Sequence, residues 1–195
     1  MESGFPPPQI DTSRPHPARL YNYYLGGKDN YPVDREAAAV LLRTLPEARE
    51  IARQNRLFMQ RVVRHLVTEA GVRQIIDIGT GIPAAGNVHE VAHEIASFRD
   101  ALAPGSYLAL SHGTADFHVP GDVGLATTVY SKATAPLVVR DHQRVTAMFS
   151  GWDLIEPGVV QVPLWRPDRP ASIPRDLAKI GIYGGVGRLG HQQRS

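Results

Sequence analysis

Cysteine is absent from this 195-residue chain, so a disulfide framework, a thiolate metal site and a cysteine nucleophile are excluded. The net charge is only +2 and the basic residues form no long block, so nucleic-acid binding is not indicated. No apolar run is long enough to span a bilayer, and the first nine residues show no basic-then-apolar signal pattern. We therefore expect a cytoplasmic protein that does not enter a membrane.

The composition that is present is ordinary for a soluble globular protein, with 43% hydrophobic and 21% charged residues. The length suits one domain, residues 1–195, with a hydrophobic core. The pattern of apolar residues divides it into a helical N-terminal region, residues 11–70, and a region of strands and helices, residues 71–190. The predicted fold class is therefore α/β.

The N-terminal region is predicted to consist of helices. Asp34 can cap a helix whose apolar face consists of Ala38, Leu41, Leu42 and Leu45. A longer helix is expected from Glu47, and Gly71 is expected to end it.

The second region is predicted to open with a βαβ unit. It consists of a buried strand at Gln74–Ile78, a helix over Asn87–Leu102 and a parallel strand at Tyr107–Ser111. Further elements are shorter: two helices at Gly124–Ala133 and Asp141–Phe149, and three strands at Trp152–Ile155, Val159–Val162 and Ile180–Tyr183.

The turn after the first of these strands carries the strongest chemical signal. Asp77 ends the apolar run, and Gly79-Thr80-Gly81 follows before a helical pattern. A strand, a glycine turn and a helix in this order can cradle a nucleotide-like cofactor, because glycine allows positive φ and close backbone approach. Ala84 replaces the third glycine of the dinucleotide fingerprint. The pattern therefore favours a nucleoside-type ligand without naming one, and a plain strand-to-helix turn is the alternative.

A second motif indicates different chemistry. His89-Glu90-Val91-Ala92-His93 matches H-E-x-x-H, in which two histidines on one helix face bind zinc and the glutamate activates water. The extended zinc-protease pattern fails, because Ala96 and Arg99 replace its glycine and third histidine. The possible third ligands, none supported by a motif, are Asp100, Asp116 and Asp122. A zinc hydrolase is therefore an alternative reading.

Several stretches together carry a family resemblance, and they follow one another along nearly the whole chain. They are Asp11–Pro15, Tyr23–Asn30 (with its Leu-Gly-Gly-Lys-Asp-Asn sequence) and Asp34-Arg35, Asp77–Gly81 with Asn87–Ala92, Leu102–Leu108 with Ser111-His112, Phe149–Gly158 and Tyr183–Val186. In these stretches the chain resembles the actinobacterial family of S-adenosylmethionine-dependent methyltransferases. The resemblance implies a Rossmann-like class I methyltransferase fold with a helical N-terminal cap. It also implies S-adenosylmethionine as cofactor and a small-molecule methyl acceptor.

The resemblance assigns roles to the residues of the glycine turn. Gly79, Thr80 and Gly81 would line the methionine and ribose of the cofactor through their backbone. Asp77 would hydrogen-bond the ammonium group of the cofactor. Stabilisation of the turn itself is the alternative role for each of these residues.

Two further places complete the expected site. The resemblance implies that Lys28, Asp29 and Asn30 fold over the cofactor, and a loop that only bonds its own backbone is the alternative. His112 follows the carboxyl end of a predicted strand, where α/β sheets place ligand contacts. It could act as a base, contact the methyl acceptor, or simply pack. No residue is singled out as the catalytic base.

The chain departs from the family between Ile95 and Phe98, where family members carry several more strands and helices. The missing block includes the strand whose acid holds the cofactor ribose, about 20 residues after the glycine turn. The next strand here ends in Ser111-His112-Gly113, without an acid. We therefore expect a truncated, incomplete sheet in which the strands at Ile75 and Tyr107 pair directly. A non-catalytic remnant that acts as a binding module is a further alternative, and an exposed sheet edge would permit a homodimer.

Overall fold

The computed structural model describes residues 11–76, 95, 97, 99–118 and 120–190. Three helices come first, α1 (Pro17–Tyr24), α2 (Pro32–Thr44) and α3 (Ala48–Thr68). The later elements are β1 (Tyr107–Gly113), α5 (Pro120–Ser131), α6 (His142–Ala147), β2 (Asp153–Leu154), β3 (Val160–Gln161), the 3-10 turns η1 (Val162–Leu164), η2 (Pro170–Ser172) and η3 (Leu177–Lys179), and β4 (Ile182–Arg188).

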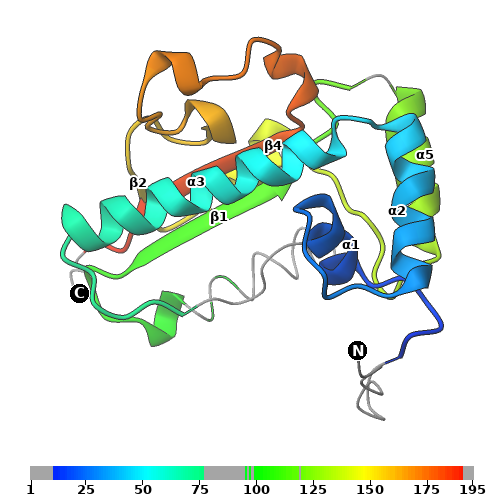
Figure 1. The fold of residues 1–195 in the computed structure, drawn as a ribbon. Coiled ribbons are helices and arrows are strands. Elements are labelled where there is room, and N and C mark those ends of the chain that lie inside the picture. Colours follow the sequence, from blue (N-terminus) through cyan, green and yellow to red (C-terminus); the bar gives the residue numbers. More distant parts are fainter. Residues whose placement is uncertain (1–10, 77–94, 96, 98, 119, 191–195) are drawn as a thin grey trace.

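The sheet is built around β4, and all of its described pairs are antiparallel. Strand β1 pairs with one edge of β4 along its whole length, from Tyr107 opposite Arg188 to Gly113 opposite Ile182. The short strands β2 and β3 pair with successive parts of the other edge. Figure 1 shows β1 and β4 side by side, with α3 running along one face of the sheet.

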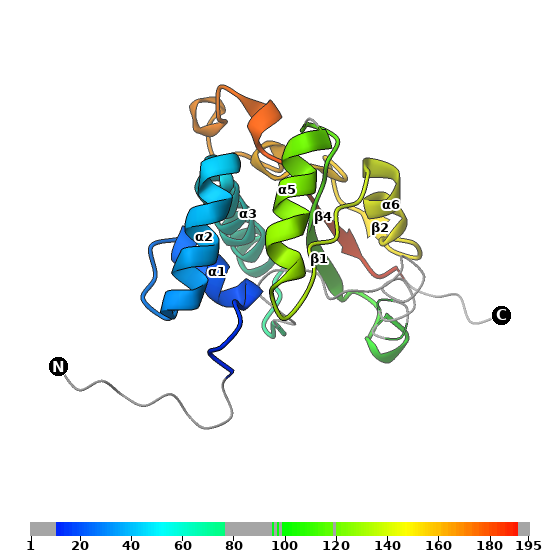
Figure 2. The same cartoon turned by 90° about the vertical axis from the view of Figure 1, so that its right-hand side faces the viewer.

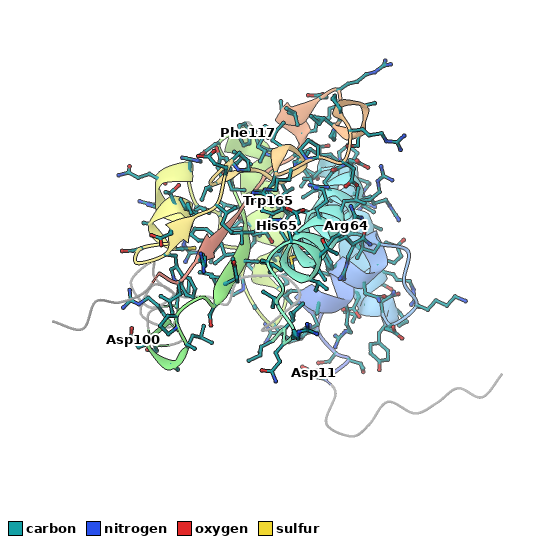
Figure 3. All side chains as sticks on the ribbon, turned by 90° about the vertical axis from the view of Figure 1, so that its left-hand side faces the viewer. Asp11, Arg64, His65, Asp100, Phe117 and Trp165 are labelled. Atoms are coloured by element: carbon teal, nitrogen blue, oxygen red, sulfur yellow. The ribbon has the colours of Figure 1, made fainter. Side chains whose placement is uncertain are left out.

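Alternate residues of β4 pack against different layers, as the two-residue period of a strand requires. Ile182 and Val186 join the core beneath α3, where Phe58, Val62 and Leu66 form a helical stripe. Tyr183 faces the other core, which holds Val145 of α6 together with Phe149 and Trp152. His65 of α3 lies against Trp165 of the first core, with ring centroids 5.9 Å apart (Figure 3). The sheet is therefore covered on both faces.

A third core joins the helical N-terminal region to α5. Helices α2 and α5 lie side by side in both views (Figures 1 and 2). This core buries Leu20 of α1, Leu41 of α2, and Ala126 and Tyr130 of α5. Pairing of α2 with a helix far along the chain fixes the helical region against the rest of the molecule.

Asp34 connects α1 with α2, and its role differs from the expected one. The helix begins at Pro32, whose fixed φ suits the first helical position, so Asp34 lies in the first turn rather than at the cap. Its Oδ2 accepts from the backbone N–H of Tyr31 (2.9 Å) and from Arg19 Nε (2.7 Å). Its Oδ1 accepts from the backbone N–H of His16 (2.9 Å). The fully buried carboxylate thus holds both helix starts together.

The prediction of a buried strand at Gln74–Ile78 is wrong for the part that the structure describes. Residues 74–76 have no strand structure, and Ile75 and Ile76 are 53% and 78% exposed. Strand β1 pairs antiparallel with β4, so the expected parallel pairing with Ile75 is not found either. An apolar run becomes a buried strand only where a partner and a covering layer exist, and no described strand pairs with these two exposed isoleucines.

Other expectations are confirmed. The strand at Tyr107 exists and extends two residues further than predicted, and α2, α3, α5 and α6 lie where helices were expected. Gly71 follows α3 with φ +69°, a conformation that suits glycine. Among the described helices, none has the length and apolar character needed to cross a membrane.

Candidate functional site

A cavity of about 180 Å³, called the inner cavity below, lies between the N-terminal helices, α5 and the ends of β1 and β4. Its described walls are mostly apolar, and three tyrosines contribute rings: Tyr21, Tyr24 and Tyr130. Polar groups come from Ser111, His112 and Thr114 at the end of β1, from Asn55 of α3 and from His118. None of the described wall residues is Asp, Glu, Lys or Arg.

Asn55 is held in one orientation by a short chain of hydrogen bonds. The carbonyl oxygen of Ala52 can only accept, so the hydroxyl of Tyr21 donates to it (3.1 Å). The Tyr21 oxygen in turn accepts from Nδ2 of Asn55 (3.3 Å). These bonds fix the orientation of the amide, with Nδ2 facing Tyr21. The other amide atom, Oδ1, is buried without a hydrogen-bond partner. Asn55 therefore brings an unused acceptor to the wall of the cavity.

His118 is placed by the turn that follows β1. The backbone N–H of Thr114 donates to Gly181 O (2.9 Å), and that of His118 donates to Ala115 O (3.0 Å). The imidazole packs directly over Gly181, where a Cβ would overlap ring atom Cε1. Its Nε2 is buried and has no hydrogen-bond partner. A second unused polar atom therefore lies at the same cavity.

His112 also lines the cavity, but both of its ring nitrogens have partners. Nδ1 lies 2.8 Å from Gly113 O, which can only accept, so Nδ1 carries the proton. Nε2 then accepts a hydrogen bond from Nη1 of Arg140. Burial lowers the pKa of His112, and the nearby Arg140 charge lowers this pKa further, whereas the bond to Gly113 raises it. His112 is thus a neutral imidazole engaged with Arg140.

A separate recess of about 720 Å³, called the outer groove, has charged walls. It contains the loop residues Lys28, Asp29 and Asn30 together with Asp11 and Arg19. Lys28 and Asp29 are exposed and have no hydrogen-bond or ion-pair partner among the described residues. The structure therefore brings the three predicted loop residues together, but in a different recess from His112.

Asn30 has a structural role in this loop. Its Nδ2 donates to Gly27 O and to Asn22 Oδ1, both at 2.9 Å. Its own carbonyl oxygen accepts from Nη1 of Arg35 (2.8 Å). Asn30 therefore bonds its own loop, whereas the side chains of Lys28 and Asp29 remain available to a ligand.

The glycine turn and the H-E-x-x-H motif cannot be placed. Asp77, Gly79, Thr80 and Gly81 lie outside the described residues, as does the segment 89–93. Within the described ranges, no group of three His, Asp or Glu side chains could hold a metal ion.

The candidate acids near β1 are engaged elsewhere. Asp100 is exposed and forms an ion pair with its neighbour Arg99 (2.9 Å). Asp116 follows the end of β1, and its Oδ2 accepts from the hydroxyl of Tyr183 (3.0 Å) and from the backbone N–H of His142 (3.0 Å). Burial of Tyr183 and, to a smaller extent, its hydrogen bond to Asp116 raise the pKa of Tyr183 to about 12. Asp116 thus ties the end of β1 to β4 and α6.

Sequence reasoning missed Asn55 and His118, although each left a signal. Asn55 occupies a position of the apolar stripe that Ile51 and Phe58 share, and a polar residue in such a stripe is informative. His118 follows the carboxyl end of β1 by a few residues, which is the argument that selected His112.

Comparisons with known proteins give one matching family and similar solved structures. A family described as S-adenosyl methyltransferase, whose cofactor is S-adenosylmethionine, matches residues 3–98 and 94–190. A crystal structure of a DUF574 family protein from Streptomyces avermitilis MA-4680 is 28% identical with a TM-score of 0.82, over 92% of this chain and 99% of that one. A crystal structure from Thermobifida fusca YX, described as a proposed methyltransferase, is 26% identical with a TM-score of 0.82. The match covers 97% of this chain and 100% of that one. No curated protein matches the chain. The chain belongs to the S-adenosyl methyltransferase family.

Proposed function

We propose that this protein is an S-adenosylmethionine-dependent methyltransferase of Rossmann-like class I fold that acts on a small molecule. The family match carries this proposal. The inner cavity supports it, because it lies at the carboxyl end of β1 beneath a helical cap, a common place for ligands in α/β proteins.

The inner cavity alone does not suit the cofactor. Its volume of about 180 Å³ is below the roughly 300–1,000 Å³ of ordinary small-molecule pockets. S-adenosylmethionine carries ammonium, carboxylate and sulfonium charges, and burial of these charges beside uncharged walls is unfavourable. The inner cavity therefore suits the methyl acceptor better than the cofactor.

The outer groove has the chemistry that the charged end of the cofactor requires. Lys28 would hold the carboxylate and Asp29 the ammonium, while Asn30 keeps their loop in shape. As the family resemblance implies, Asp77 would also hydrogen-bond the ammonium, and Gly79, Thr80 and Gly81 would line the methionine and ribose. S-adenosylmethionine would supply an electrophilic methyl group when bound. This chain's own residues bind and orient both molecules.

Loss of part of the family's sheet would give the proposal a rival. We propose that the block holding the ribose-binding acid is missing. The two family matches meet at residues 94–98, where the resemblance indicated the join. A remnant that binds a partner without catalysis would share the same fold. Binding of the cofactor separates the two functions.

The test is calorimetric titration of the purified full chain with S-adenosylmethionine and S-adenosylhomocysteine, after circular dichroism has confirmed folding. We expect micromolar binding. Gly81→Val should abolish it, because a side chain there would fill the space that the backbone leaves for the ligand. Lys28→Ala should weaken it about tenfold through loss of a charge-assisted hydrogen bond. Lys179→Ala, which removes a lysine outside the groove, is the matched control. A folded protein that binds neither compound would be a remnant.

A further inference from the structure

We propose that the inner cavity binds a small, neutral aromatic molecule with a hydroxyl group, that is, a phenol. We also propose that this phenol is the methyl acceptor. The acceptor role rests on the proposed function, whereas the binding of the phenol does not.

The charge of the occupant follows from the walls. The described wall residues include no acidic side chain, no lysine and no arginine. Arg140, which donates to the wall residue His112, is 3% exposed and does not itself line the cavity. A carboxylate or ammonium group inside would lose its hydration without gaining a partner, which is strongly unfavourable. The occupant is therefore uncharged.

The size and shape of the occupant follow from the volume and the rings. A space of about 180 Å³ holds a molecule of about one ring rather than a drug-sized ligand. Tyr21, Tyr24 and Tyr130 line it together with aliphatic side chains of α2 and α3. Aromatic side chains prefer edge-to-face and offset contacts with a second ring. A single aromatic ring uses these walls best.

The polar group of the occupant follows from the unused atoms. Oδ1 of Asn55 can only accept, and a buried acceptor without a donor costs about 1–3 kcal/mol. A ligand O–H or N–H at this wall would satisfy it. Native proteins rarely leave such an atom unpaired, and Asn55 belongs to the cavity wall, so a donor on a ligand in the cavity is the partner that would satisfy it.

The second unpaired atom, Nε2 of His118, indicates that the polar group of the ligand is a hydroxyl. Nε2 of His118 donates or accepts according to its tautomer, and a hydroxyl can pair with it in either state. With Nε2 unprotonated, His118 could also remove the phenolic proton. The phenolic oxygen would then bond to the methyl carbon, the methyl–sulfur bond would break with its electron pair left on sulfur, and the proton would pass to Nε2.

The binding test uses p-cresol as probe, toluene as the matched ring without a hydroxyl, and 4-hydroxybenzoate as the charged analogue. Ligand-observed NMR with the full chain, with and without S-adenosylhomocysteine, gives the affinities. We expect p-cresol to bind about tenfold more tightly than toluene, since it satisfies a buried acceptor. We expect 4-hydroxybenzoate not to bind.

Single substitutions test whether p-cresol binds in the inner cavity. Asn55→Leu should reduce the preference for p-cresol over toluene to about onefold, because the acceptor is gone. Gln54→Leu replaces a neighbouring buried amide of α3 that does not line the cavity, and should leave the preference unchanged. Ala126→Leu should fill the cavity and abolish binding of both probes. If Asn55→Leu fails to fold, His118→Phe tests the second polar atom in the same assay.

The outcomes separate this inference from the proposed function. The inference would be overturned if p-cresol does not bind the folded protein with or without S-adenosylhomocysteine. It would also be overturned if the unmodified chain binds p-cresol and toluene equally. Either result would count even if S-adenosylmethionine binds. Binding of p-cresol that depends on Asn55, in a protein that does not bind S-adenosylmethionine, would support the phenol site and reject the methyltransferase.

Discussion

Nη1 of Arg140 donates a hydrogen bond to Nε2 of His112 inside the protein, where the two residues are 3% and 4% exposed. This bond joins β1 to the segment that precedes α6. It requires a neutral imidazole, because a protonated ring would place a second positive charge against the guanidinium. Protonation of His112 therefore destabilises the folded state.

The first prediction concerns pH. The pKa of His112 in the folded state is lowered by burial and by Arg140, so the unfolded chain binds its proton at a higher pH. The unfolding free energy should therefore rise with pH as the pH approaches the unfolded-state pKa of about 6.5 from below. Above that pKa, the contribution of neutral His112 to the unfolding free energy is complete. His112→Asn should flatten the dependence of unfolding free energy between pH 5.0 and 7.5. Urea titrations at several pH values measure it, and equal slopes for both proteins would contradict the prediction.

The second prediction concerns the carboxylate between α1 and α2. Asp34→Ala leaves the N–H groups of His16 and Tyr31 and the guanidinium of Arg19 without their acceptor. We expect a loss of about 3–5 kcal/mol in unfolding free energy, as for other broken buried pairs. Glu36→Ala, an exposed acid of the same helix, should change it by no more than about 0.5 kcal/mol. Chemical denaturation of both variants tests the contrast, and similar losses would show that burial is not the cause.

The third prediction compares two arginines of α3. Arg61 is buried and donates to the backbone oxygens of Trp165 (2.9 Å) and Val162 (2.6 Å). Arg61→Met should cost about 2–4 kcal/mol because two buried acceptors lose their donors. Arg64 pairs with Asp168 at the surface, so Arg64→Met should cost less than about 1 kcal/mol. Thermal unfolding followed by circular dichroism distinguishes the two, and a larger shift for Arg64→Met would refute this account.

The fourth prediction concerns the glycines of β4. A Cβ on Gly184 would lie 2.8 Å from Cζ of Phe58, so Gly184→Ala should destabilise the protein by about 1–3 kcal/mol. Gly124 in α5 has no atom near the position of a Cβ, so Gly124→Ala should stabilise it by about 0.5–1 kcal/mol. Urea midpoints of the two variants should move in opposite directions. Shifts of the same sign would contradict the packing described for β4.

The sequence predicts those elements whose pattern is set locally. Helix α3 follows from an apolar stripe at helical spacing, and β1 follows from an apolar run between Pro104-Gly105 and a polar turn. Strand β4 was predicted only to Tyr183, because Gly184-Gly185-Val186-Gly187 has the composition of a turn. These glycines are required by rings from two layers, Phe58 on one face and Phe149 on the other. Local propensity carries no information about such packing.

In the candidate site, too, the sequence predicts local features but not the tertiary contacts. The place of His112 at the end of β1 could be predicted from the chain, but its partner Arg140 could not, because tertiary packing brings them together. The unused oxygen of Asn55 depends on Tyr21, which belongs to another helix. Lys28 and Asp29 were predicted from a motif, and only the structure separates their groove from the cavity at His112.

The central position of β4 has a consequence for biosynthesis. Strand β1 ends at Gly113, and its partner β4 begins only at Ile182, after every other described strand. A ribosome that adds about 5–20 residues per second needs several seconds to synthesise the intervening segment. During this interval the nascent β1 lacks its only partner among the described strands, so the edge that later pairs with β4 is open to chaperones or to neighbouring nascent chains.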